Sequence, residues 1–363
     1  MRLFQNSGVY PAYLQRLRRL TEGLGRFEEQ RRAFLDDRYG ACHLLLPVLS
    51  NSPEAFFTNG DDEALQRAWA REHGMPATTH LADILLAQIE DHQTEVFYNM
   101  DPMRYGSDFV HKLPGCVRKS ITWRAAPSSG GTFSAYDLLV CNFQSILETY
   151  RAQGMRVAPL APAHDPEMDA YAVKCERPID VLFVGGYSRH HSRRAAVLEA
   201  VASLRGQRKV AFHLDCSRLT RLAESRLGRL LPLAAHRRPR DIAGVTEPPV
   251  FGRELYHALS QAKIVLNGAV DMAGEDRGNM RCFESLGCGA LMVSDTGRYP
   301  EGFSADSTHL EYANAAQARH VIEGALADPD RLSATAAAGP LMICARYSKF
   351  TQWSDFQRIV EGL

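Results

Sequence analysis

Short apolar runs alternate with helical patterns of apolar positions along the whole chain. The apolar runs that predict strands lie at 1–5, 42–49, 95–99, 117–123, 138–141, 157–160, 179–184, 210–214, 264–266, 290–293 and 310–312. The helical patterns lie at 10–20, 61–73, 81–93, 144–153, from 195 onward, and at 252–262, 280–286, 315–326, 329–338 and 347–360. Strands that alternate with helices pair in parallel, so the pattern predicts an α/β protein with mostly parallel sheets.

The chain is long enough for two domains. Single cores stop growing at about 250–300 residues, and this chain has 363. Residues 161–178 contain three prolines and little periodicity, which is typical of a linker. We therefore expect one domain at 1–162, a linker at 163–178, a second domain at 179–345 and a last helix at 346–363.

Composition excludes several classes of protein. Formal net charge is zero, whereas a nucleic-acid-binding domain is usually strongly basic. The eight cysteines form no C-x-x-C pair and no zinc-type spacing with histidine, so we expect reduced thiols and no metal site. The first residues lack the apolar region of a signal peptide, and no apolar run approaches the roughly 20 residues of a membrane span. We therefore expect a cytoplasmic protein without an integral membrane segment, and peripheral membrane contact stays open.

An arginine-rich segment separates two of the predicted strands. Residues 218–240 contain seven arginines. Such a segment could recognise an anionic acceptor, a phosphate or an acidic membrane surface, or it could be a solvated helix face. Leucines are interleaved among the arginines at 219, 222, 227, 230 and 231. This interleaving favours the solvated helix face.

The stretch 264–295 carries the most informative chemistry. It predicts a strand, a polar loop over 271–278, a helix over 280–286 capped by Asn279, and a second strand. A helix N-terminus favours phosphate, and the fork of Arg281 can bind a diphosphate through two bonds. Glu284 can accept hydrogen bonds from two vicinal hydroxyls, so these parts suit a ribose diphosphate. The alternative is that Arg281 and Glu284 form an ordinary surface pair.

A second phosphate-binding candidate follows the predicted strand 179–184. Small residues at Gly185 and Gly186 let the backbone close on a phosphate. Cationic donors follow at Arg189, His190, Arg193 and Arg194. A nicotinamide dinucleotide is less favoured, because the glycines do not form G-x-G-x-x-G. In addition, Asp215 comes about thirty residues after Gly185, against about twenty in dinucleotide-binding domains.

The run NMRCFESLGCGALMVSD, followed by the acidic turn around Glu301, resembles the donor-binding half of GT-B glycosyltransferases. Within them it is most similar to the group-1-like subset that includes CgeB-type proteins, which carry an R-x-F-E-x-x-x-x-G-A-like segment. The resemblance covers about residues 180–363. It implies two Rossmann-like domains that face each other across a cleft, with the last helix returning to the first domain.

The resemblance also implies roles for individual residues. Related retaining enzymes carry E-x7-E, in which Glu284 matches the second acid, and Asp276, with Glu275 beside it, stands at the first. It thus implies catalytic roles for Asp276 or Glu275, which would contact the transferred sugar, and for Arg281. The implied donor-binding residues are Gly185, Gly186, Arg189, Arg277, Asn279, Arg281 and Glu284. On the acceptor side, Gly8 and His164 are candidates.

The expected function is therefore transfer of a sugar from a nucleotide-diphosphate donor in glycoconjugate biosynthesis. The acceptor is a small molecule, a glycan or a protein. We expect retention of configuration, and neither metal nor cofactor, because positive groups replace the metal. An inverting enzyme would need a general base, for which His43, His111 and His164 are the candidates. The alternative function is a non-catalytic protein of the same fold that binds a nucleotide sugar or a partner.

Overall fold

The computed structural model describes residues 1–128, 132–173, 176–268 and 274–363. The chain divides into two compact units. The first contains Met1–Ala163, Met272–Asp276 and Tyr347–Leu363, and the second contains His164–Asp271 and Arg277–Arg346. Two parts of the predicted segments, 174–175 of the linker and 271–273 of the polar loop, lie outside the described residues.

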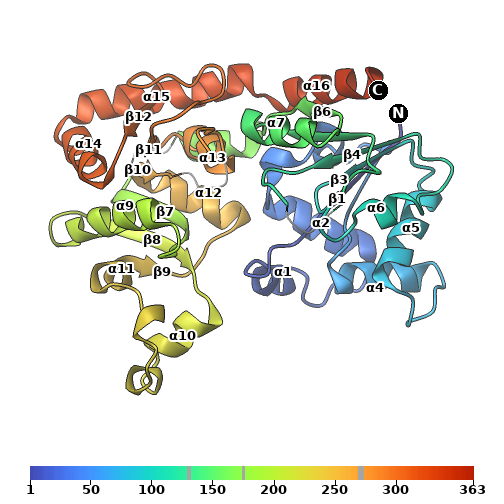
Figure 1. Ribbon diagram of the computed structural model, residues 1–363, viewed down its shortest axis with the longest axis horizontal. Coiled ribbons are helices and arrows are strands. Elements are labelled where there is room, and N and C mark those ends of the chain that lie inside the picture. Colours follow the sequence, from blue (N-terminus) through green and yellow to red (C-terminus); the bar gives the residue numbers. More distant parts are fainter. Residues whose placement is uncertain (129–131, 174–175, 269–273) are drawn as a thin grey trace. The chain divides into compact units, whose positions relative to one another are not determined.

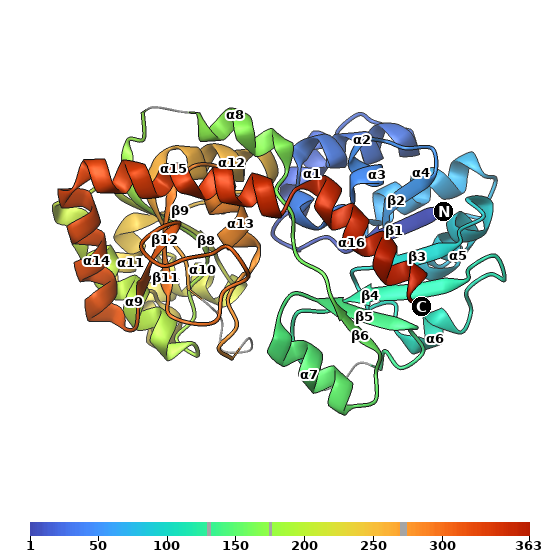
Figure 2. The ribbon, with the colours of Figure 1, turned by 90° about the horizontal axis from the view of Figure 1, so that it is seen from above.

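The first unit is built on a parallel sheet with the order β2-β1-β3-β4-β5-β6 among the described residues (Figures 1 and 2). Its strands are β1 (Leu3–Ser7), β2 (Ala55–Asn59), β3 (Val96–Asn99), β4 (Lys119–Trp123), β5 (Leu138–Cys141) and β6 (Val157–Pro159). Its helices are α1 (Leu14–Leu20), α2 (Phe27–Asp37), η1 (Ala41–His43), α3 (Leu46–Leu49), α4 (Glu63–Glu72), α5 (Leu81–Asp91), α6 (Ser107–Val110), α7 (Gln144–Ala152) and α16 (Lys349–Glu361). The strands are nearly continuously buried, as expected where helices cover both faces of a parallel sheet.

One predicted strand is wrong. Residues 42–49 form the end of the 3₁₀ helix η1 and the short helix α3, with Pro47 in the first helical turn, where its missing N–H costs nothing. The strand beside β1 is instead β2, in which Leu3 pairs with Ala55. A short apolar run does not distinguish a buried strand from a buried helix, which explains the error.

The last helix, α16, is fastened within the first unit. Lys349 is 3% exposed, and its Nζ donates to the carbonyl oxygens of Ala41 and Leu44 at 2.6 and 2.7 Å. Gln352 donates to the carbonyl of Cys42 at 2.9 Å. Figure 2 shows α16 lying over β3, which agrees with a spacing of 5.1 Å between the rings of Phe356 and Tyr98.

The second unit is built on a parallel sheet with the order β12-β11-β10-β7-β8-β9 among the described residues. Its strands are β7 (Ile179–Gly186), β8 (Val210–Asp215), β9 (Thr246–Glu247), β10 (Ala262–Leu266), β11 (Leu291–Asp295) and β12 (His309–Tyr312). Its helices are η2 (Pro166–Met168), α8 (Asp169–Ala172), α9 (Ser192–Ala202), η3 (Ser203–Gly206), α10 (Arg218–Glu224), η4 (Gly228–Leu230), η5 (Ala234–His236), α11 (Arg240–Val245), α12 (Gly252–Ser260), α13 (Met280–Gly287), α14 (Ala315–Ala327) and α15 (Pro329–Arg346).

This strand order is that of the dinucleotide-binding fold, with β7 as its first strand. The chain leaves β7 toward β8 on one side and later adds β10 on the other, so the order reverses between β7 and β10. In open parallel sheets, ligands bind at the carboxyl ends of the strands at such a reversal. The fold therefore directs attention to the residues that follow β7 and β10.

Candidate functional site

The carboxyl edge of the second sheet gathers residues from the ends of three strands. A Cβ atom on Gly185, at the end of β7, would lie 2.7 Å from Nη2 of Arg194. Arg194 also stacks over the ring of Phe183 at 5.1 Å, and its Cγ would be 4.0 Å from a Cβ on Gly268, after β10. The Tyr312 hydroxyl, at the end of β12, donates to the carbonyl of Asn267 at 2.6 Å. Arg194 thus places a cation at the reversal point of the sheet.

Another arginine proposed for this loop, Arg189, lies elsewhere. Arg189 donates through Nη2 to the carbonyl of Arg237 at 3.0 Å, which ties the loop after β7 to the segment after α10. Gly186 has open space around it, with no atom within 4 Å of an added Cβ. Arg194 is one of the four cationic residues that follow the two glycines in the sequence. It differs from Arg189 in lying close to Gly185.

The start of α13 is held against the end of β10. Asn279 caps the helix, as predicted, by accepting a hydrogen bond from the backbone N–H of Cys282 at 3.3 Å. The amide of Asn279 also donates to the side-chain oxygen of Asn267 at 3.2 Å. These two bonds fix the direction of the N–H groups in the first turn of α13, which lies at the same sheet edge.

Arg281 and Glu284 form a largely buried pair on α13. Nη1 of Arg281 donates to Oε2 of Glu284 at 2.7 Å, and the two side chains are 19% and 5% exposed. Burial raises the pKa of Glu284, the Arg281 guanidinium opposes this, and the Asp165 carboxylate adds to it. A surface ion pair is therefore ruled out for these two residues. An ionised carboxylate has about four acceptor sites, so Glu284 can accept further hydrogen bonds from ligand hydroxyls.

Arg277, another predicted donor-binding residue, is engaged at the end of β11. Its Nη2 lies 2.8 Å from Oδ2 of Asp295 and donates to the carbonyl of Thr296 at 2.8 Å. Its backbone N–H donates to the carbonyl of Arg298 at 2.9 Å. Arg277 therefore fastens the loop before α13 to the neighbouring strand, which is a positioning role.

The two predicted sugar-contacting acids belong to the segment that clusters with the first unit. Asp276 is 3% exposed, and its Oδ2 accepts a hydrogen bond from the backbone N–H of Ser145 at 2.7 Å, in the first turn of α7. A carboxylate at a helix N-terminus is electrostatically stabilised. Glu275, the residue before it, is exposed.

Gly8, the acceptor-side candidate, lies at the reversal point of the first sheet, between β1 and β3. A Cβ on Gly8 would be 3.1 Å from Oδ2 of Asp101, which follows β3. The backbone N–H of Val9 donates to both carboxylate oxygens of Asp61, which follows β2, at 3.0 Å. Burial raises the pKa of both Asp61 and Asp101. Sequence reasoning missed Asp61 because it missed β2, after which Asp61 stands.

The three candidate histidines have different surroundings. His164 belongs to the second unit, is 3% exposed, and places Nε2 2.8 Å from Oδ1 of Asp169. Burial, and then the charge of Lys349, lower the pKa of His43 to about 3, so that it is a weak base. His111 follows α6 as its C-terminal cap. None of the three lies at the end of a strand of the first sheet.

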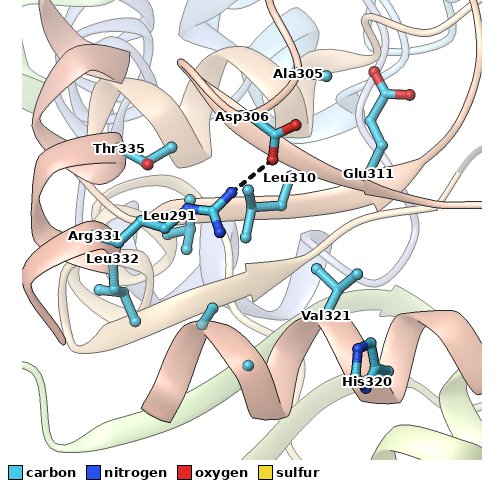
Figure 3. A pocket seen from close by; sticks show the side chains of 12 residues that line it. Leu291, Ala305, Asp306, Leu310, Glu311, His320, Val321, Arg331, Leu332 and Thr335 are labelled. Carbon is cyan, nitrogen blue, oxygen red and sulfur yellow. Dashed lines mark hydrogen bonds and ion pairs between the residues drawn. The ribbon is translucent and has the colours of Figure 1, made fainter. Parts of the chain in front are cut away.

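A cavity of about 270 Å³ lies away from the candidate site (Figure 3). Leu291, the first residue of β11, lines it together with residues of α14 and α15. Asp306 and Arg331 form an ion pair at 3.0 Å among its lining residues. Because Leu291 is at the amino end of β11, this cavity is not part of the carboxyl edge described above.

Two searches over the described residues were negative. No group of three or more histidine, cysteine, aspartate or glutamate side chains there is arranged to hold a metal ion. No helix in the described part of the chain is long and apolar enough to cross a membrane.

Comparisons with known proteins agree with this architecture. Residues 193–355 match the family model described as glycosyl transferase-like. No curated protein sequence matches the chain. HepE of Anabaena, solved with UDP and glucose, is similar over 100% of both chains, with 11% identity and a TM-score of 0.62.

Two further solved structures share the fold. Sucrose-phosphate synthase of Thermosynechococcus elongatus is similar over 99% of this chain and 98% of its own, with 10% identity and a TM-score of 0.54. TarM is similar over 77% of this chain and 58% of its own, with 8% identity and a TM-score of 0.55. The chain has the α/β fold of GT-B glycosyltransferase structures, and its residues 193–355 match the glycosyl transferase-like family model.

Proposed function

We propose that the protein transfers a glycosyl group from a nucleoside diphosphate sugar to a hydroxyl-bearing acceptor. The observation that carries this proposal is the buried pair of Arg281 and Glu284 on α13, beside the reversal point of a nucleotide-binding type of sheet. Burial of an ion pair is costly in desolvation, so such a pair is weak support for stability alone. A ligand that uses both charges explains its presence.

Each group at this edge suits one part of the donor. Glu284 accepts hydrogen bonds from the two ribose hydroxyls. Arg281, Arg194 and the first-turn N–H groups of α13 balance the charge that develops on the leaving diphosphate. The positive groups take the place of a metal ion in this proposal. HepE was solved with UDP-glucose, which makes UDP the first nucleoside diphosphate to test.

The sugar and acceptor ends of the reaction are assigned by the same reasoning. Asp276 or Glu275 contacts the transferred sugar, and we propose retention of configuration from the spacing of Asp276 and Glu284. The acceptor approaches the edge of the first sheet where Gly8 leaves room in front of Asp101. Arg277 acts by positioning the loop before α13.

A non-catalytic donor-binding protein is the second candidate. It is favoured by one observation, the hydrogen bond that Asp276 accepts at the start of α7. A carboxylate committed to a helix N-terminus has less capacity to contact a sugar. In this case the protein would bind a nucleotide sugar without turnover.

Release of nucleoside diphosphate tests the proposal. The full chain is incubated with UDP-glucose, other UDP-sugars, GDP-sugars and TDP-sugars, and binding of UDP, GDP and TDP is followed by thermal shift. A ligand at about one hundred times its Kd stabilises by about 2.7 kcal/mol, which is a readable shift. We expect one nucleoside diphosphate to raise the melting temperature of the wild type but not of Glu284→Gln.

The matched control is Glu323→Gln, which removes a glutamate from the exposed Arg319–Glu323 pair on α14. It should leave binding and release unchanged. Binding without release above background would identify the non-catalytic protein. Absence of any shift with all three nucleoside diphosphates, or a shift kept by Glu284→Gln, would refute the site.

A further inference from the structure

The segment between β8 and α11 exposes several leucines. Leu227 and Leu230 are 77% and 85% exposed, and Leu219, Leu222 and Leu231 are about half exposed. These are five of the large apolar side chains that the described structure leaves in solvent, and they fall within thirteen residues. We call residues 217–240 the Arg-Leu projection. Figure 1 shows α10, which begins it, on the far side of α11 from α9.

Internal bonds hold the Arg-Leu projection in this conformation. Arg237 donates to the carbonyls of Ala223, Gly228 and Leu231 at 3.0–3.1 Å. Arg238 forms an ion pair with Glu224. Two arginines are therefore used to fold the segment back on itself. These hydrogen bonds and this ion pair hold the backbone that carries the exposed leucines.

Three of the remaining arginines are exposed beside these leucines in the sequence. Arg218, Arg221 and Arg226 are exposed, and no acidic side chain among the described residues pairs with them. Leu219 and Leu222 are three apart on α10, as are Arg218 and Arg221, so each kind of residue forms its own stripe. The result is a short apolar stripe flanked by a cationic one.

The charge of the Arg-Leu projection is strongly one-sided. It contains seven arginines against one glutamate, while the whole chain is formally neutral. The rest of the chain therefore carries the balancing negative charge. A surface of anionic lipid would attract this segment and repel the remainder, and so would orient the protein.

We propose that the Arg-Leu projection binds an anionic lipid bilayer, with its leucines inserted at the level of the headgroups and its arginines on lipid phosphates. Interfacial segments combine these two kinds of side chain, with cations on one face and apolar residues such as leucine on the other. Protein interfaces are instead enriched in aromatic residues and methionine as well as arginine. Residues 217–240 contain no phenylalanine, tryptophan, tyrosine or methionine.

The Arg-Leu projection contains none of the proposed donor-site residues, although it is joined to the segment that carries some of them. The projection starts two residues after Asp215 of β8, which pairs with Gly186 of β7. The bond from Arg189 to the carbonyl of Arg237 joins the loop after β7 to the same segment. Lipid binding therefore acts near the carboxyl edge of the second sheet, while its test needs no glycosyl transfer.

Vesicle co-sedimentation of the full chain tests the proposal. The vesicles are phosphatidylcholine alone, or phosphatidylcholine with about one third phosphatidylglycerol. We expect binding to the anionic vesicles only, and a steep loss between about 0.1 and about 1 M salt. The triple variant Arg218→Gln/Arg221→Gln/Arg226→Gln should bind about a hundredfold more weakly, because each cation near an anionic surface contributes about a fivefold factor.

The apolar contribution has its own variant and control. Leu227→Ser/Leu230→Ser should lower binding at least about tenfold. Leu341→Ser, which changes a leucine that is 74% exposed on α15, should have no effect. Equal binding to both vesicle types, no binding to either, or an equal loss in the control would overturn the proposal. So would self-association of the wild type that Leu227→Ser/Leu230→Ser abolishes, because the leucines would then contact a second copy.

Discussion

Replacing Arg281 by methionine would leave Glu284 as a buried carboxyl without its cationic partner. The Glu284 side chain is 5% exposed, and Nη1 of Arg281 is 2.7 Å from its carboxylate. Burial raises the pKa of Glu284 even with the guanidinium present. Without it, we expect the carboxyl group to remain protonated in the folded protein at neutral pH, because a buried acid neutralises rather than hold an uncompensated charge.

The cost of this protonation sets the size of the effect. In the unfolded chain the carboxyl group has an ordinary pKa of 4.5 and is ionised at pH 7. Holding the proton in the folded state costs about 1.4 kcal/mol for each pH unit above 4.5, which is about 3 kcal/mol at pH 7. The folded variant binds one proton more than its unfolded state, so its stability is lost as pH rises. Near pH 5 the deficit should be below about 1 kcal/mol.

The double variant Arg281→Met/Glu284→Gln is the matched control. It removes both charges, and replacing a whole buried pair is often nearly neutral for stability. We expect the free energy of unfolding in urea to be within about 1 kcal/mol of wild type at pH 7. The difference in unfolding free energy between this double variant and wild type should not depend steeply on pH, unlike that of the single variant. Both variants should lose the nucleoside diphosphate-induced thermal shift.

Urea unfolding of the variants at pH 5, 6, 7 and 8 tests whether the loss of stability comes from the buried carboxyl group of Glu284. A loss below about 1 kcal/mol for Arg281→Met at pH 7 would mean that Glu284 is not confined against Arg281. An equal loss at pH 5 and pH 7 would mean that the cost is packing rather than charge. A thermal shift retained by both variants would refute the assignment of this pair to the donor.

Two further predictions concern close packing. Gly185→Ala should weaken nucleoside diphosphate binding, because its Cβ would lie 2.7 Å from Nη2 of Arg194. Gly186→Ala should not weaken it, because an added Cβ there meets open space. Thermal shifts of the two variants test this prediction, and equal losses of the ligand-induced shift would contradict it. Lys349→Met should destabilise the protein by about 2–4 kcal/mol, since it strands two buried carbonyl oxygens. Urea unfolding measures this loss, and an unchanged midpoint would show that α16 is not anchored by that ammonium group.

Local sequence patterns predicted the elements around the proposed donor site well. The order strand, loop, helix, strand over 264–295 corresponds to β10, α13 and β11. The cap at Asn279 was predictable because a capping bond joins residues three apart, and so its signal is contained in a few neighbouring positions. Strand order was beyond reach, because it depends on contacts between residues far apart in the chain.

The error at 42–49 has a physical origin. Apolar composition at 42–49 indicated burial, which the structure shows, but burial alone did not select strand over helix. The leucines at 219–231 are apolar too, yet no other element among the described residues covers Leu227 and Leu230 enough to hide them. The pattern of apolar side chains in a sequence indicates which residues can be buried. Whether a second surface covers them is decided by the rest of the fold.

Arg277 and Arg281 show why residue type alone does not assign a role. They stand four positions apart beside one helix start, and the sequence gives both the same chemistry. In the structure Arg277 lies 2.8 Å from Asp295 and donates to the carbonyl of Thr296, which follows β11. Arg281 instead has one carboxylate partner, Glu284, within its own helix. A cation whose bonds cross to the next strand fixes a loop, whereas a cation paired only with its own helix can turn its other donors to a ligand. The division between positioning and binding therefore follows from the strand order, which brings Asp295 to Arg277.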